Sequence, residues 1–335
     1  MNKFSKFCQE LTEYSNIKPS IYLSPASGYR ARSEFGVSKD SYTMIENGKK
    51  IYMGISDIPH PSIQKIMPKL LTHINESNIL KKKLFQINFR SSGSDILATL
   101  IYHKQLKDEW INEALKITQI FKNLSIIGRA KKQKIVNGNE NLKMICNYEH
   151  SSFAILQNDL FFFQPNFYLY SKMISFITYH LNNTKDLLEL YCGCGGFTLP
   201  LSSRFNKVFA TENNRHAVRL LLESMKLNNL SNIETARLSD DETALALANK
   251  RIFRRLKNIN LASYDFSHIL VDPPRVGLTQ ETINLSRQFQ IMIYVSCNPD
   301  SFFRDLKILN RKIQSIGLFD QFSNTGHLEV IAILK

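Results

Sequence analysis

The segment that decides the fold is Leu187-Leu188-Glu189-Leu190-Tyr191-Cys192-Gly193-Cys194-Gly195-Gly196-Phe197. Its first half is an apolar run typical of a buried strand, and its second half is a glycine-rich loop. Glycines directly after a strand allow a sharp turn into a helix and let the backbone approach a ligand closely. The pattern therefore predicts the first strand and the ligand-binding loop of an α/β sheet, although such loops also occur at tight turns that bind nothing.

A second predicted strand, residues 207–211, follows this loop and ends at Glu212. A carboxylate at this place can accept hydrogen bonds from both hydroxyls of a cofactor ribose, in NAD and in S-adenosyl-L-methionine alike. The loop has the pattern Gly-x-Gly-Gly and lacks the third glycine of a pyrophosphate-binding loop, which favours S-adenosyl-L-methionine. The alternative role for Glu212 is a capping carboxylate before a helix that starts at Asn214.

The chain has 335 residues, a length that suits two domains, and its pattern changes near residue 160. After this point predicted strands alternate with helical stretches, which indicates a doubly wound, mostly parallel, Rossmann-like sheet. Before it, short strands and helices indicate an α+β region. We therefore predict an N-terminal domain over 1–160 and a catalytic domain over 161–335. The predicted strands are 51–55, 97–102, 186–191, 207–211, 269–271, 291–295 and 330–334, and the predicted helices are 62–75, 108–124, 214–228 and 301–309.

The formal net charge of +14 favours a polyanionic partner such as a nucleic acid, because each neutralised phosphate releases condensed counterions. A compositional bias toward Lys, Asn and Ile across a whole proteome is the alternative. Any single basic segment is more typical of a solvated surface than of a binding site. Taken together, four of them could form an extended phosphate-binding surface: residues 29–32, 81–83, 129–134 and 251–257.

Five cysteines in a chain of this size form no disulfide framework, which indicates a reducing cytoplasm. Cys192 and Cys194 have no second cysteine pair at metal-ligand spacing, so we expect no metal site. The first residues lack the apolar core of a secretory signal, and no apolar run is long enough to span a bilayer. We expect a soluble, cytoplasmic protein and, by default, a monomer.

A second informative stretch is Ser296-Cys297-Asn298-Pro299, which follows the predicted strand 291–295. Upstream, Asp272-Pro273-Pro274-Arg275 follows another apolar run. Ligands bind at the carboxyl ends of parallel strands, so these two segments predict one site. A buried free cysteine usually acts as a small apolar residue. A catalytic thiolate would need a positive or hydrogen-bonding neighbour, and Arg275 is a candidate.

A thiolate beside a methyl donor has a specific use in pyrimidine chemistry. Its addition to carbon 6 turns carbon 5 into a nucleophile that can attack the methyl group, and a general base must then remove the proton of carbon 5. From their positions alone, Asp320, His327 and Glu329 are comparable candidates for this base.

With these motifs assembled, the chain resembles the tRNA (uracil-5-)-methyltransferase family nearly from end to end. The carboxyl-terminal half carries the resemblance at residues 163–166, 187–193, 210–212, 271–275, 296–299, 318–322 and 327–329. The amino-terminal half carries it at residues 29–35, 83–87, 102–104, 108–110 and 127–130, which separate the tRNA branch from the ribosomal RNA branches.

The resemblance implies roles for individual residues. Cys297 becomes the nucleophile toward carbon 6, and Glu329 becomes the base that removes the carbon 5 proton. The cofactor is S-adenosyl-L-methionine, and Asp272 is in addition a candidate contact of the uracil. The positions that the family uses for this cofactor correspond to Gln164, Tyr191, Gly196, Glu212 and Asp272.

The resemblance implies methylation of carbon 5 of uridine 54 in the T-loop of tRNA. The similar loop of tmRNA is a second possible target. The resemblance also implies that the N-terminal domain recognises the RNA. The alternative is a 23S rRNA uracil-5-methyltransferase. The chain lacks the small β-barrel domain and the four-cysteine set of the ribosomal RNA enzymes, and this argues against the 23S rRNA alternative. The family loop usually reads Gly-Asn-Gly-Asn-Phe, so Gly196 lacks a side-chain amide and we expect weaker cofactor affinity.

Overall fold

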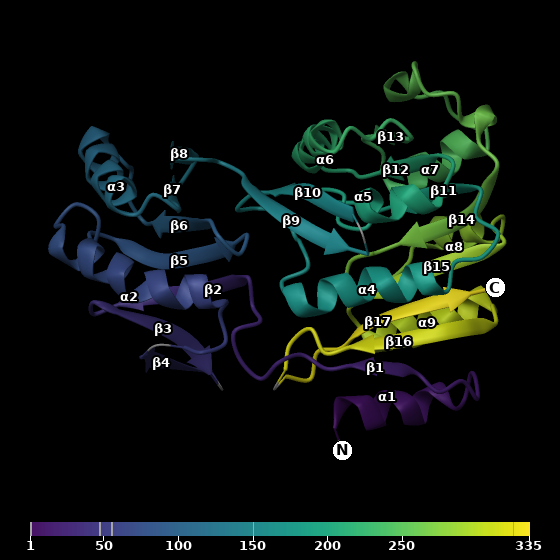
Figure 1. Cartoon of the computed structure of the whole chain (residues 1–335), viewed down its shortest axis with the longest axis horizontal. Helices are drawn as coiled ribbons and strands as arrows, with labels where there is room; N and C mark the ends of the chain where they lie inside the picture. The colour runs from purple at the N-terminus through teal and green to yellow at the C-terminus, as the bar shows by residue number, and fades with distance from the viewer. Residues whose placement is uncertain (1, 47, 55, 150, 324) are drawn as a thin grey trace. The chain divides into compact units, whose positions relative to one another are not determined.

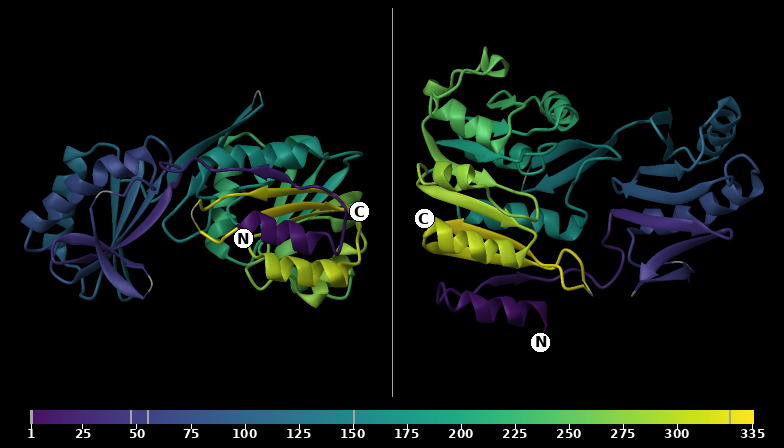
Figure 2. Two further views of the ribbon diagram at one scale, coloured as in Figure 1. Left: turned by 90° about the horizontal axis from the view of Figure 1, so that it is seen from below. Right: turned by 180° about the vertical axis from the view of Figure 1, so that it is seen from behind.

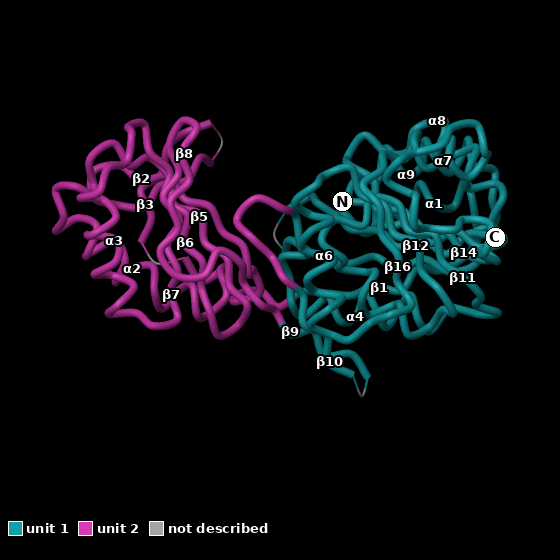
Figure 3. Tube along the Cα trace, turned by 90° about the horizontal axis from the view of Figure 1, so that it is seen from above, with its two compact units in different colours: residues 1–24, 145–155, 162–335 teal, residues 25–144, 156–161 magenta. Residues whose placement is uncertain are grey.

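The computed structural model describes residues 2–46, 48–54, 56–149, 151–323 and 325–335. The chain forms two compact units (Figure 3). Unit 1 consists of Met1–Ser24, Ile145–Ile155 and Phe162–Lys335, and unit 2 consists of Pro25–Met144 and Leu156–Phe161. A single boundary at residue 160 does not describe these units, because the segment Met1–Ser24 belongs with the carboxyl-terminal half.

Unit 1 is built on an eight-stranded sheet in which β17 runs antiparallel to both of its neighbours (Figure 1). The predicted Rossmann-like fold is therefore confirmed. The chain passes from β11 to β12 on one side and later returns to β14 on the other, so the strand order reverses at β11. Ligands of open α/β sheets bind at such a reversal. In spatial order the strands are β1 (Ser20–Tyr22), β16 (Ile313–Phe319), β17 (Glu329–Leu334), β15 (Ile291–Ser296), β14 (Phe266–Val271), β11 (Asp186–Leu190), β12 (Val208–Thr211) and β13 (Ile233–Ala236).

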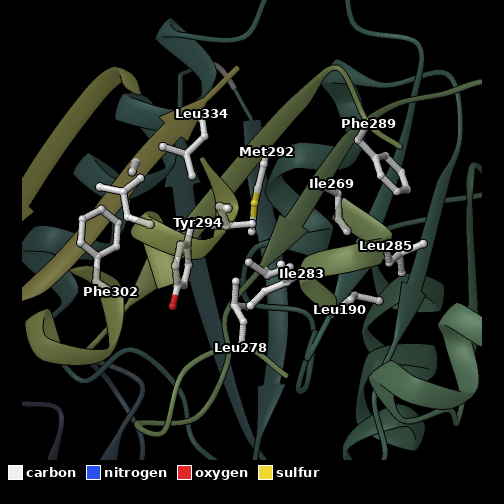
Figure 4. Packing of buried hydrophobic residues seen from close by; sticks show 14 of the residues in the cluster. Leu190, Ile269, Leu278, Ile283, Leu285, Phe289, Met292, Tyr294, Phe302 and Leu334 are labelled. Carbon is white, nitrogen blue, oxygen red and sulfur yellow. The ribbon is translucent and has the colours of Figure 1, made fainter. Parts of the chain in front are cut away.

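Helices cover both faces of this sheet (Figure 2). One face packs under α1 (Lys3–Leu11), α7 (Asp240–Leu247), α8 (Gln280–Ser286) and α9 (Pro299–Leu309), which share one apolar core with the strands. Figure 4 shows part of this core around Met292 and Tyr294. The opposite face carries α4 (Phe167–Tyr179), α5 (Thr198–Leu201) and α6 (Arg215–Leu227). Unit 1 also contains three short 3₁₀ helices: η1 (Ser202–Arg204), η2 (Arg254–Leu256) and η3 (Leu261–Ser263).

Local signals start the helices that border the site. The Asn214 side chain accepts hydrogen bonds from the backbone N–H groups of His216 and Ala217 and so caps α6. Asn298 caps α9 in the same way, and Pro299 occupies its first turn, where a missing N–H costs nothing. The cap residue of α9 is thus the direct neighbour of Cys297.

Unit 2 is α+β, as predicted, with a seven-stranded sheet covered by two helices whose apolar faces join its core. The helix predicted over 108–124 ends earlier, at Ile120, because Leu124 is already a buried residue of the next strand. The strand predicted over 51–55 falls on β4, which ends at Met53, and residue 55 lies outside the described residues. A separate two-stranded sheet pairs β9 (Leu142–Tyr148) with β10 (Ser151–Gln157), and most of its residues, Ile145–Ile155, belong to unit 1. The other elements are β2 (Arg32–Ser38), β3 (Ser41–Glu46), β4 (Lys49–Met53), α2 (Pro61–Glu76), β5 (Leu84–Ser91), β6 (Ile96–Tyr102), α3 (Asp108–Ile120), β7 (Leu124–Ala130) and β8 (Gln133–Asn137). None of the helices in the described ranges is long and apolar enough to cross a membrane.

Candidate active site

The predicted site residues gather along one edge of the unit 1 sheet. Glu212, Tyr191, Asp272 and Cys297 each follow the last residue of a parallel strand, namely β12, β11, β14 and β15. Glu329 is the first residue of β17, and it reaches the same edge because that strand runs antiparallel. Ser296 pairs with Val330, so the next residues outward, Cys297 and Glu329, are neighbours across two adjacent strands.

The Cys297 thiol is half-buried, and its surroundings do not favour the thiolate. Burial raises its pKa to about 11, with further increases from Glu329 and Asp272. Arg275 lowers the pKa, as expected from the sequence, but its effect is smaller. The thiol is therefore protonated at neutral pH before substrate binds.

The two neighbouring carboxyl groups are also perturbed. Glu329 is buried, and burial together with the charge of Asp272 raises its pKa well above the usual range. Burial raises the pKa of Asp272 to about 7. Perturbed groups that cluster in this way are typical of catalytic sites, because a base with a raised pKa is strong once it loses its proton.

The other two candidates for the base have different partners. Asp320 forms an ion pair with Lys3, whose Nζ lies 2.5 Å from its Oδ1. His327 Nδ1 lies 2.8 Å from Arg275 Nη2. Only Glu329 among the three raises the pKa of Cys297. The choice of Glu329 as the base stays a prediction from the resemblance.

Cys297 lines a pocket of about 190 Å³. This is smaller than the roughly 300–1,000 Å³ of sites that enclose whole drug-sized ligands, and Glu329 and Asp272 are not among the residues that line it. Arg275 and His327 line it from the carboxyl-terminal half. Helix α1 supplies a further wall, with Lys3, Lys6, Phe7 and Glu10. Sequence reasoning missed α1, because no local motif links it to residues near the other end of the chain.

The glycine loop after β11 makes the predicted sharp turn. Gly193 and Gly195 have positive φ values of 54° and 91°, and even Tyr191 adopts a φ of 60°, which is unusual for an aromatic residue. A Cβ on Gly195 would lie 2.5 Å from Leu221 Cδ1, so only glycine fits there. A Cβ on Gly196 would meet nothing closer than the Phe163 ring at 3.5 Å.

Glu212 accepts hydrogen bonds from two backbone N–H groups, those of Gly193 (3.1 Å) and Asn214 (2.7 Å). It does not cap α6, because Asn214 fills that role. Each of its carboxylate oxygens receives one bond and keeps a second acceptor position. Glu212 is also partly exposed. It can therefore receive the two hydroxyls of a cofactor ribose, so the residues present fit a nucleoside cofactor.

Gln164 and Tyr191 lie at the same edge, but their polar atoms have protein partners. The buried Gln164 Oε1 accepts a hydrogen bond from Gln321 Nε2 at 3.0 Å, and Gln321 Oε1 is buried with no hydrogen-bond partner among the described residues. The Tyr191 hydroxyl donates a hydrogen bond to Asp240 Oδ2 at 2.7 Å. Because the hydroxyl is engaged in this way, the aromatic ring is the part of Tyr191 that could contact a ligand. Within the described ranges, no three His, Cys, Asp or Glu side chains are grouped as metal ligands.

The chain is similar in sequence to known proteins over nearly its whole length. A family model described as tRNA (Uracil-5-)-methyltransferase matches residues 1–335. A tRNA/tmRNA (uracil-C(5))-methyltransferase of Campylobacter concisus is 38% identical over 98% of this chain and 91% of its own length. One of Campylobacter lari is 40% identical over 92% of this chain and 90% of its own length.

A solved structure also has the same fold. The tRNA (uracil-54, C5)-methyltransferase of Pyrococcus abyssi, solved in complex with S-adenosyl-L-homocysteine, superposes with a TM-score of 0.77. It is 22% identical, and the match covers 99% of this chain and 83% of that one. From the full-length family match and these relatives, the chain belongs to the tRNA (uracil-5-)-methyltransferase family.

Proposed function

We propose that this protein transfers a methyl group from S-adenosyl-L-methionine to carbon 5 of uridine 54 in the T-loop of tRNA. The observation that carries the proposal is the register of β15 and β17, which makes Cys297 and Glu329 neighbours at the edge that also holds the glycine loop and Glu212. A nucleophile, a base and a nucleoside-binding loop at one sheet edge suit this reaction, and the names of the relatives support the substrate.

Glu212, Gln164, the Tyr191 ring, the backbone at Gly196 and Asp272 would hold the cofactor, which supplies an electrophilic methyl group. The Cys297 thiol and the Glu329 carboxyl group first release their protons to solvent. The Cys297 thiolate then adds to carbon 6 of the uracil, and the electron pair of the carbon 5–carbon 6 double bond becomes available at carbon 5. After carbon 5 is methylated, Glu329 accepts its proton. The double bond reforms, and the thiolate leaves carbon 6.

The raised pKa values suit this order of events. An ionised Glu329 opposes formation of the Cys297 thiolate, because the two negative charges lie side by side. Addition to carbon 6 moves the negative charge from sulfur into the uracil ring, and transfer of the methyl group to carbon 5 removes that charge. Neither the sulfur nor the ring is then anionic when the Glu329 carboxylate accepts the carbon 5 proton.

We infer that unit 2 recognises the RNA and that the reaction occurs in the cytoplasm, with a monomer as the active species. Three of the four basic segments lie in unit 2. Within one of them Arg129 pairs with Asp159, whereas Lys131 and Lys132 are exposed and available for phosphates. The target base must leave its loop to reach Cys297, at a cost of a few kcal/mol. The T-loop of tmRNA is a second proposed substrate.

Methylation of unmodified RNA transcripts tests the proposal. We expect the purified protein to methylate a tRNA transcript, and to lose this activity when uridine 54 is replaced by cytidine. A 23S rRNA fragment is the competing substrate. Methylation of the rRNA fragment with none of the tRNA would replace this proposal with the ribosomal alternative.

A further inference from the structure

The pocket of Cys297 depends on helix α1, which lies at the other end of the chain. Helix α1 packs on α9 through Phe7, whose ring lies 4.7 Å from that of Phe303 and 5.9 Å from that of Phe302. Lys3 and Lys6 are on its first turns and line the same pocket as Cys297. This helix therefore forms part of the site, although the motifs of the reaction all lie beyond residue 160.

One side chain connects α1 to the segment that leads to the base. Lys3 Nζ lies 2.5 Å from Asp320 Oδ1 and donates a second hydrogen bond to the Phe322 carbonyl at 2.9 Å. The two charged side chains are only 13% and 10% exposed. Asp320 is further held by its backbone N–H, which donates to the Tyr22 carbonyl at the end of β1. The carboxyl-terminal segment is thus attached to the amino terminus by a largely buried ion pair.

Residues 320–323 in turn contact both halves of the site. Gln321 Nε2 donates to Gln164 Oε1, on the cofactor side, at 3.0 Å. On the other side the Phe322 ring lies 5.9 Å from the His327 ring, and His327 contacts Arg275. The Arg275 carbonyl accepts a hydrogen bond from Asn298 Nδ2 at 2.9 Å, next to Cys297. A continuous series of contacts therefore runs from Lys3 around the pocket to the nucleophile.

We propose that Lys3 is a positioning residue of the active site. Its ion pair with Asp320 holds α1 against residues 320–323. This contact keeps the α1 side of the Cys297 pocket closed, and it fixes the position of the segment that leads to Glu329. The catalytic part of this inference rests on the proposed function. The part that concerns closure of the pocket depends only on the structure.

The physical reason is the cost of an unpaired buried charge. Removing one partner of a buried pair leaves the other charge in a poorly solvated place, and the segment that carries it moves toward water. Removing both partners avoids this cost. A displacement of about 1 Å of catalytic groups can lower a rate on the order of a hundredfold. Small movements of residues 320–323 are thus sufficient for a measurable effect.

Two measurements on four variants test the proposal. The variants are Lys3→Met and Asp320→Asn, which break the pair, Lys3→Arg, which keeps the charge, and Lys18→Met as a control at an exposed lysine outside the pocket. The first measurement is the rate of Cys297 alkylation by iodoacetamide without RNA, resolved by mass spectrometry. The second is kcat and KM for methylation of a tRNA transcript.

We expect Lys3→Met and Asp320→Asn to raise the alkylation rate several-fold and to lower kcat roughly ten- to hundredfold with a smaller change in KM. Lys3→Arg and Lys18→Met should remain within about twofold of the wild type, on the scale of surface substitutions. If a single variant fails to fold, the double variant Lys3→Met/Asp320→Asn replaces it, because it leaves no unpaired charge.

The outcomes separate this inference from the proposed function. Unchanged alkylation and unchanged kcat in Lys3→Met, beside an active wild type, would overturn the role of Lys3. A wild-type protein that methylates no tRNA would instead overturn the proposed function. Faster alkylation in Lys3→Met would still support closure of the pocket in that case.

Discussion

Glu329 and Cys297 lie next to each other across β17 and β15, and the charge of Glu329 opposes ionisation of the Cys297 thiol. The register Ser296–Val330 creates this relationship, because it brings two motifs that are separate in the chain to adjacent strand ends. The arrangement keeps the nucleophile protonated until substrate arrives. Addition to carbon 6 takes the negative charge off the sulfur, and methyl transfer neutralises the ring before Glu329 accepts the carbon 5 proton.

The first prediction concerns the pH dependence of the thiol. Because burial raises the pKa of Cys297 to about 11, its alkylation rate should still be increasing above pH 9. Glu329→Gln removes a negative neighbour and should shift the profile to lower pH. Arg275→Gln removes a positive neighbour and should shift it to higher pH. Alkylation across a pH series measures these shifts, and a wild-type midpoint near that of a free thiol would contradict the prediction.

The second prediction concerns the covalent intermediate. Glu329→Gln should permit addition of Cys297 to the uracil and transfer of the methyl group, but should slow removal of the carbon 5 proton by about 10²–10⁴-fold. An RNA–protein adduct should therefore accumulate on a denaturing gel. Cys297→Ala, the matched control, should form no adduct and should still bind the cofactor. Absence of an adduct with Glu329→Gln would indicate another base.

The third prediction restores the side-chain amide that is usual in the family loop. Gly196 has room for a side chain, since a Cβ would make only ordinary contact with Phe163 at 3.5 Å. Gly196→Asn should tighten cofactor binding by about two- to tenfold, the equivalent of one added hydrogen bond. Isothermal titration with S-adenosyl-L-homocysteine measures the change. Weaker binding of S-adenosyl-L-homocysteine by Gly196→Asn would contradict the prediction and would show that this loop requires glycine at position 196.

The fourth prediction compares two neighbouring glycines. Gly195→Ala should lower the free energy of unfolding by about 1–3 kcal/mol, because Gly195 has a φ of 91° and its Cβ would lie 2.5 Å from Leu221 Cδ1. Gly196→Ala should change stability much less, because Gly196 has neither constraint. Chemical denaturation of both variants measures the difference. Equal effects would show that the loop adjusts freely.

The fifth prediction concerns RNA affinity. If the net charge of +14 serves phosphate binding, the affinity for tRNA should fall steeply with salt. Six or more phosphate contacts would lower it on the order of 10³-fold between about 50 and 200 mM salt. Filter binding across a salt series measures this slope. If the affinity did not change with salt concentration, the basic composition would be explained by a proteome-wide bias instead.

Local sequence patterns are enough to predict the individual parts of the site. Apolar runs that end in Tyr191, Glu212, Asp272 and Cys297 mark strands whose carboxyl ends must share one edge once the sheet is parallel. Hydrophobic periodicity and cap residues act over a few positions, so they are visible in the chain. For the same reason the sequence predicted helix α6 closely, with Asn214 and Asn228 as its caps.

The contacts between distant parts of the chain become visible only in the folded protein. The pairing of β1 with β16 and the ion pair of Lys3 with Asp320 place the amino terminus in the catalytic unit, and no local pattern encodes contacts between opposite ends of the chain. The same holds for the thiol. Its motif suggested activation by Arg275, whereas the pKa depends on burial and on carboxylates brought in from two other strands. Desolvation and charge coupling are properties of the packed sheet, so they exist only once the chain has folded.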